Sequence, residues 1–196
     1  GSKISTKINV VKNLIKIFDN IIIVGGMANT ILKFKGLNIG KSICEDNKEK
    51  LIEEIFKSSR EHNCEINYPI DVVVSEKLDG FGKNKELSEI QKNEMILDIG
   101  PKTLFSIKKI LDKSNTILWN GPAGYFENPN FENGTKEIAK MISLRSSKND
   151  IFSVVGGGET VAAINKYSNI NSYTFVSTAG GAFLEYLEGK ELPGIK

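Results

Sequence analysis

Short runs of apolar, mostly β-branched residues recur along the chain, and most of them end in a glycine-containing turn. The segments between them mostly place apolar residues three or four positions apart, which is the spacing of a helix that packs one face against a core. The apolar runs are residues 20–26, 71–76, 95–101, 115–124, 151–158 and 172–181. This pattern predicts strands that alternate with helices.

Continuous apolar runs are typical of strands that are buried on both faces. The expected fold is therefore α/β, with a doubly wound, mainly parallel sheet inside a Rossmann-like three-layer α/β/α arrangement. We find no repeat or linker, so residues 1–196 are expected to form a single domain. The polar segment 78–94 is expected to be a mobile excursion from it. Ligands of such folds bind at the carboxyl ends of the strands, which is where the glycine turns lie.

Composition excludes several classes of function. Lysine and arginine number 26 against 24 acidic residues, and a net charge of +2 provides no electrostatic footprint for nucleic acid or an anionic membrane. The longest apolar run, residues 21–24, is far shorter than the roughly 20 residues of a membrane span. Cys44 and Cys64 cannot form a disulfide framework, so we expect reduced thiols and a cytoplasmic protein. The one histidine, His62, has no second histidine nearby for a triad or a zinc site.

Two familiar nucleotide motifs are only approximated. The stretch GLNIGKS at 36–42 resembles the phosphate loop G-x-x-x-x-G-K-[ST], but three residues separate its glycines instead of four. The dinucleotide fingerprint also fails, because the glycines of residues 156–158 continue with Glu159, Thr160 and Val161. Neither standard loop accounts for this chain.

The segment GGGET at 156–160 instead predicts a glycine turn at the start of a helix. Amides at a helix N-terminus lack intrahelical partners and carry roughly half a positive charge, so they can bind phosphate oxygens. The motif alone leaves two interpretations open. Either the turn binds an anionic ligand, or Glu159 merely complements the helix dipole while Thr160 helps to cap the helix.

Three further segments extend this pattern. STAGG at 177–181 predicts a second helix that opens on glycines, with Gly180 and Gly181 at its start. WNGPAGYFE at 119–127 offers a tight turn followed by aromatic residues and the carboxylate of Glu127, which would suit a purine and a ribose, or else would be a structural turn. Lys3 and Lys7 lie four positions apart and are either phosphate ligands or solvated lysines.

Taken in order, the motifs resemble the C-terminal half of phosphoglycerate kinase. They are GSKISTKI, GGMANTILKFKGLNIGKSICE, PIDVVVSEK, LDIGPKT, WNGPAGYFE, GGGETVAAI and STAGGAFLEYLEGKELPGI. The resemblance implies that residues 1–196 are the nucleotide-binding domain of an enzyme that transfers a phosphoryl group between ATP and 3-phosphoglycerate in glycolysis. The N-terminal domain that binds phosphoglycerate would be absent from this chain. The implied substrate is ATP or ADP with Mg²⁺, in a monomer that binds neither nucleic acid nor membrane.

The resemblance also implies roles for individual residues. Lys7, its companion Lys3 and Gly181 would act at the transferring phosphoryl group. Glu127 would hold the ribose hydroxyls, and Glu159 would contact Mg²⁺ directly or through water, since a hard dication takes oxygens from phosphate and carboxylate together. The remaining nucleotide-binding positions would be Gly25, Gly26, Asn120, Gly121, Pro122, Gly157, Gly158 and Thr160.

The chain departs from the family pattern at three positions. The family usually has Asp at the position of Glu159, and glycines at the positions of Ile96 and Ala179. We expect Ile96 to make the nucleotide pocket more apolar and Ala179 to restrict the backbone at the last helix start. Two alternatives compete with the kinase: a stand-alone nucleotide-binding module without turnover, and a Rossmann-type dehydrogenase, which lacks its fingerprint here.

Overall fold

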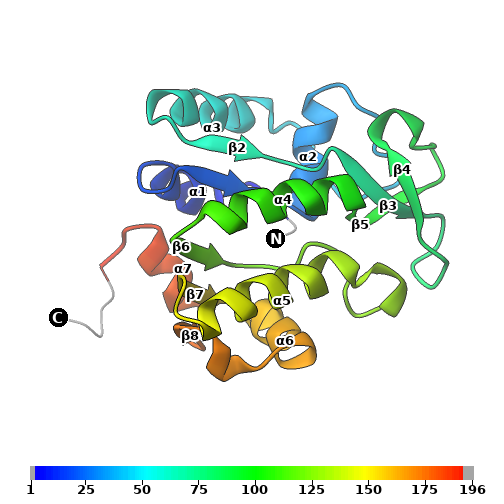
Figure 1. The fold of residues 1–196 in the computed structure, drawn as a ribbon. Coiled ribbons are helices and arrows are strands. Elements are labelled where there is room, and N and C mark those ends of the chain that lie inside the picture. The colour runs from blue at the N-terminus through cyan, green and yellow to red at the C-terminus, as the bar shows by residue number, and fades with distance from the viewer. Residues whose placement is uncertain (1–2, 192–196) are drawn as a thin grey trace.

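The computed structural model describes residues 3–191, in which helices alternate with short strands (Figure 1). The helices are α1 (Ile8–Ile15), α2 (Gly26–Phe34), α3 (Glu49–Glu61), α4 (Pro101–Lys113), α5 (Asn133–Ser147), α6 (Gly158–Tyr167) and α7 (Gly181–Leu187). The strands are β1 (Asn20–Ile22), β2 (Glu65–Asn67), β3 (Asp71–Ser75), β4 (Lys83–Glu86), β5 (Met95–Ile99), β6 (Thr116–Trp119), β7 (Phe152–Gly156) and β8 (Phe175–Ser177).

Two of the three sheets are parallel, which confirms the predicted α/β class. Strand β1 pairs with β2, and β6, β7 and β8 pair in that order. Helices connect the parallel neighbours, as a crossover between parallel strands requires. In Figure 1, α4 and α5 run side by side along one face, and α6 lies beside α5.

The third sheet is antiparallel, and here the structure differs from the single mainly parallel sheet expected from the sequence. Strand β3 lies between β4 and β5 and runs antiparallel to both. The segment 76–94 contains no α-helix that could carry the chain back for a parallel pairing, so β5 returns in the opposite direction. The excursion at 78–94 is thus partly regular structure, since it contributes β4 and a short 3₁₀ helix at Leu87–Glu89.

Two apolar cores support the parallel sheets. One lies around β6 and β7 and includes Trp119, Phe126, Ile142 and Val155. The other lies around β1 and β2 and is built mainly from α1, α2 and α3. A cavity of about 850 Å³ lies between them, lined by residues 20–24 on one side and 115–121 on the other. Within residues 3–191, no helix has both the length and the apolar composition needed to cross a bilayer.

Candidate functional site

Three helices begin directly after a glycine that has a positive φ. Gly25, Gly157 and Gly180 precede α2, α6 and α7, with φ angles of 67°, 95° and 53°. Residues with a Cβ rarely adopt these angles, so the glycine runs of the sequence mark the sharp strand-to-helix turns. Glycine has no side chain that could cap these helices, but the Ala28 amide of α2 and the Ala182 amide of α7 already donate to the backbone carbonyls of Gly25 and Ala179.

Helix α6 offers the clearest anion-binding start. Its first backbone bond runs from the Val161 amide to the Gly157 carbonyl at 2.9 Å, so the amides of residues 158–160 have no partner within the helix. Gly158 and Glu159 are exposed. A Cβ at Gly158 would meet no atom within 4 Å, which shows that the space above this turn is open.

Side-chain hydrogen bonds join this turn to the turn after β6. The Asn120 amide nitrogen donates to the Gly156 carbonyl at 2.7 Å, and the Gly121 backbone amide donates to the Thr160 hydroxyl at 2.7 Å. The Trp119 indole donates to the Gly121 carbonyl at 2.8 Å. The structure therefore brings Asn120, Gly121 and Thr160 together, with Pro122 following in the same turn. Thr160 is only 1% exposed, so its side chain holds the loop, and the exposed residues of this turn are Gly158 and Glu159.

Lys7 and Glu159 come close enough to interact, although one precedes α1 and the other begins α6. Lys7 is half-buried, and burial lowers the pKa of its ammonium, while the negative charges of Glu188 and Glu159 act to raise it. A partly desolvated ammonium that interacts electrostatically with a carboxylate in the first turn of α6 is suited to neutralising a phosphate bound at that turn. Glu188, at the end of α7, also forms a 2.6 Å ion pair with Lys190. Glu188 lies within the quoted motif that begins at Ser177, but it was not among the predicted site residues.

The other predicted residues differ in how exposed they are. Lys3 is exposed, and no hydrogen bond or ion pair of residues 3–191 joins its ammonium to Lys7 or Glu159. Gly26 is buried at the start of α2, whereas Gly181 is exposed at the start of α7. Glu127 is exposed and follows the buried Phe126 in the loop after β6.

A buried carboxylate that sequence reasoning did not select lies beneath the same loop. Asp98, in β5, is 2% exposed and accepts hydrogen bonds from the amides of Gly134 at 2.7 Å and Ile99 at 2.9 Å. A Cβ at Gly124 or Gly134 would overlap its carboxylate. Burial raises the pKa of Asp98 to about 7, against the effect of the two amides. Asp98 thus lies between the loop after β6 and the start of α5.

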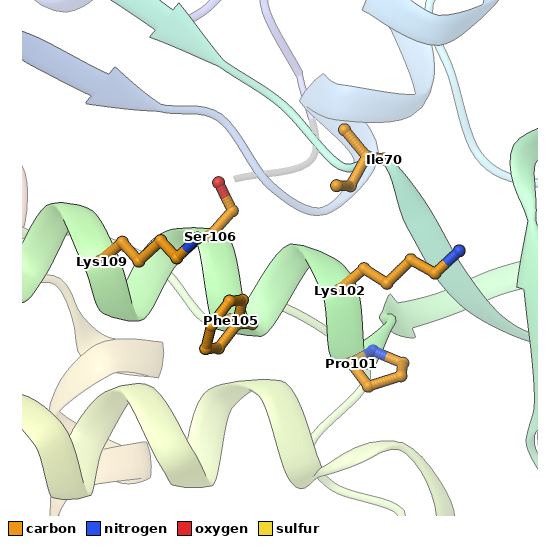
Figure 2. Close-up of a pocket in the computed structure, with 6 residues that line it drawn as sticks. All are labelled: Ile70, Pro101, Lys102, Phe105, Ser106 and Lys109. Carbon is orange, nitrogen blue, oxygen red and sulfur yellow. The ribbon is translucent and has the colours of Figure 1, made fainter.

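A shallow pocket of about 470 Å³ elsewhere on the surface contains none of the predicted residues. It lies along α4, and Figure 2 shows its lining: Ile70, Pro101, Lys102, Phe105, Ser106 and Lys109. Lys109 lies 4.5 Å from the centre of the Phe105 ring. By contrast, Lys7, Asn120 and Gly121 line the cavity between the two parallel sheets. The glycine turns and this cavity, rather than the α4 surface, locate the candidate site.

Comparison with known proteins gives one consistent match. The family described as "Phosphoglycerate kinase" matches residues 1–190. The chain is 42% identical to the phosphoglycerate kinase of Chelativorans sp. (strain BNC1) and 44% identical to that of Francisella philomiragia subsp. philomiragia. Both alignments cover 100% of this chain and 50% of the relative, so the chain spans about half the length of the curated relatives that it matches.

Solved structures agree with the sequence comparisons. The structure of phosphoglycerate kinase from Coxiella burnetii superposes with a TM-score of 0.91 at 41% identity, covering 97% of this chain and 49% of that one. The phosphoglycerate kinase structure from Pyrococcus horikoshii OT3 gives a TM-score of 0.76 at 31% identity, covering 98% of this chain and 48% of that one. The similarity therefore extends over nearly the whole fold described above.

Proposed function

The chain belongs to the phosphoglycerate kinase family, and on that premise we propose that it is the nucleotide-binding domain of an enzyme that transfers a phosphoryl group between ATP and 3-phosphoglycerate. The observation that supports this most directly concerns three groups, two at the start of α6 and a third whose pKa is influenced by the charge of Glu159. These are the free amides at the start of α6, the exposed Glu159 carboxylate and the half-buried Lys7 ammonium.

The nucleotide phosphates would bind at the start of α6. The exposed amides of Gly158 and Glu159 would supply donors, the buried Thr160 would hold the turn, and the glycine at 157 would let a phosphate approach the backbone closely. The bonds from Asn120 and Gly121 hold this turn in place before a ligand arrives. Gly25 and Gly26 at the start of α2 would flank the adenine, and Glu127 would hold the ribose hydroxyls.

The carboxylate at this turn suits a magnesium ion that would also bind the phosphate oxygens. Magnesium usually takes one or two carboxylates together with phosphate oxygens and waters, and Glu159 is an exposed carboxylate next to the amides that would hold those phosphates. When bound, the ion would neutralise charge on the phosphates. Glu159 is longer by one methylene than the aspartate usual in the family, so we expect a shifted ion or one that is bridged by water.

Phosphoryl transfer depends more on positioning and charge neutralisation than on covalent chemistry. Lys7 would follow the transferring phosphoryl group, assisted by Lys3, while the start of α7 at Gly181 would face it. No general base is needed, because the acceptor of the phosphoryl group is already a carboxylate.

The acceptor would be bound by an N-terminal domain outside this chain. We therefore expect these 196 residues alone to bind Mg-ADP without turnover, which is also the behaviour of a stand-alone binding module. A coupled assay with ATP and 3-phosphoglycerate distinguishes an active kinase, which would turn over, from an isolated domain or a stand-alone module, neither of which would. A monomeric state and a cytoplasmic location remain predictions.

Calorimetric titration with Mg-ADP tests the proposal. We expect saturable binding that weakens when magnesium is chelated. No heat of binding at millimolar nucleotide would contradict the nucleotide-binding assignment. Titration with NADH serves as the comparison, because binding of NADH instead of Mg-ADP would favour a dehydrogenase.

A further inference from the structure

The C-terminal end of α6 holds the backbone of the residue next to Glu127. The Lys166 ammonium donates to the Phe126 carbonyl at 3.0 Å, and the Tyr167 hydroxyl lies 3.1 Å from the same oxygen. The Phe126 ring is 6% exposed and packs edge-on against Tyr167, with ring centres 6.4 Å apart. Both the backbone and the side chain of Phe126 are therefore fixed by α6.

Glu132 connects the two donors. It lies 2.9 Å from the Tyr167 hydroxyl, whose single proton is shared between this carboxylate and the Phe126 carbonyl. It also lies 3.1 Å from the Lys166 ammonium and 3.2 Å from the Lys136 ammonium. Burial alone would raise the pKa of Glu132, but hydrogen bonds from Tyr167, Lys166 and Lys136 lower it, so the carboxylate stays ionised near neutral pH. We call Glu132, Lys166 and Tyr167 the carbonyl clamp.

Glu127 itself is exposed, and none of the hydrogen bonds or ion pairs among residues 3–191 engages its carboxylate. A carboxylate that must accept from two vicinal hydroxyls needs a fixed position, because a mobile one loses conformational entropy on binding. The clamp fixes the preceding carbonyl and therefore the direction in which the Glu127 side chain leaves the backbone.

We propose that Tyr167, Lys166 and Glu132 are positioning residues that orient Glu127 toward the ribose hydroxyls of the nucleotide. The inference rests on the proposed function, in which Glu127 binds the ribose. It adds that one helix, α6, connects the proposed phosphate site with the loop that carries Glu127. Helix α6 presents its first amides and Glu159 to the phosphates, and its last two residues hold the loop that carries Glu127.

The test measures affinity for Mg-ADP and for Mg-2′,3′-dideoxy-ADP, which lacks both ribose hydroxyls, in the wild-type chain and in Tyr167→Phe. We expect the substitution to weaken Mg-ADP by about threefold to tenfold, the range for one lost hydrogen bond, and to leave the dideoxy nucleotide unchanged. In a Glu127→Gln background, Tyr167→Phe should cause no further loss. Equal weakening of both nucleotides would show a general role in loop stability and overturn the proposal, as would no weakening of either.

Two further variants keep the test decisive. Tyr173→Phe is the matched control, because its buried hydroxyl also bonds a backbone carbonyl, that of Ala139 at 3.1 Å. Its other partner is the Ser168 hydroxyl at 2.8 Å, and neither partner belongs to the loop that carries Glu127. Tyr173→Phe should leave the ratio of the two affinities unchanged. If Tyr167→Phe does not fold, Lys166→Met is the alternative, because it removes the ammonium that bonds the Phe126 carbonyl and lies at an exposed position. It should also weaken Mg-ADP relative to the dideoxy nucleotide.

The outcomes also separate this inference from the proposed function. A wild-type chain that binds no Mg-nucleotide overturns the proposed function. A wild-type chain that binds both nucleotides equally removes the ribose role of Glu127. A wild-type preference for ADP that survives in both Tyr167→Phe and Lys166→Met overturns the clamp alone.

Discussion

The Gly121 amide donates a 2.7 Å hydrogen bond to the hydroxyl of Thr160, which fastens the turn after β6 to the first turn of α6. Thr160 is nearly inaccessible, so no water can replace its oxygen without rearrangement. This bond and the one from Asn120 to the Gly156 carbonyl hold together two segments that are about 40 residues apart in the sequence.

Replacing Thr160 with valine should leave the Gly121 amide without an acceptor. We expect a loss of about 1–3 kcal/mol in the free energy of unfolding, which is the cost of a buried polar group left unsatisfied. Urea unfolding measures it. Thr116→Val, at an exposed position in β6, is the control and should change stability by less than about 0.5 kcal/mol. Equal stability of the two variants would show that the bond contributes nothing.

Alanine at Gly157 should be more damaging than alanine at Gly158. Gly157 has a φ of 95°, and a Cβ there would lie 2.7 Å from the Asn120 amide nitrogen, whereas one at Gly158 would meet nothing within 4 Å. The strained backbone should cost about 1–3 kcal/mol. Thermal unfolding of both variants tests this difference, and Gly158→Ala supplies the control. A Gly157→Ala protein as stable as Gly158→Ala would contradict the interpretation.

Stability should fall as the pH rises through the titration of Asp98. Its pKa is about 7 in the folded chain and about 3.9 when unfolded, so between these values the folded state holds more protons. The contribution is complete below about pH 4 and is lost as the pH approaches about 7, with a slope of up to about 1.4 kcal/mol per pH unit.

Urea unfolding of the wild type and Asp98→Asn at about pH 5 and about pH 7 checks this slope. The wild type should lose more stability between the two conditions, because asparagine does not titrate. Parallel changes in both proteins would mean that Asp98 is ionised in the fold throughout this range.

Glu159→Gln should weaken the binding of Mg-ADP while preserving the fold, because an amide oxygen is a poorer ligand for magnesium than a carboxylate. We expect a loss of about tenfold, comparable to a charge-assisted contact of roughly 1.5 kcal/mol. Glu159→Asp keeps the charge and restores the residue usual in the family, so it should bind at least as well as the wild type. Unchanged binding by Glu159→Gln would return this residue to a dipole-complementing role.

Much of the fold followed from local pattern. The apolar runs located β1, β3, β5, β6, β7 and β8, and the glycine runs located the turns at Gly25, Gly157 and Gly180. The direction of pairing did not follow, because an apolar run looks the same in either orientation. Strand β2 was also overlooked, since only Ile66 of its three residues is buried.

The parts of the candidate site that depend on glycine turns could be predicted from the sequence. The parts that depend on contacts between residues far apart in the sequence could not. Asp98 occurs within a quoted motif, but its importance depends on burial under a loop from another part of the chain. Tyr167 lies at the end of a helix whose start attracted attention, and only its contact with the Phe126 carbonyl reveals a role. Whether Lys3 reaches the nucleotide remains a prediction.

The antiparallel sheet has a consequence for association between copies of the chain. Strand β4 is an outer strand of this sheet, and its four residues, Lys83–Glu86, are all polar. An outer strand exposes unpaired amides and carbonyls that can recruit a strand from another molecule, and charged side chains oppose such pairing. The segment that was expected to be a mobile excursion therefore opposes strand addition at this edge of the sheet.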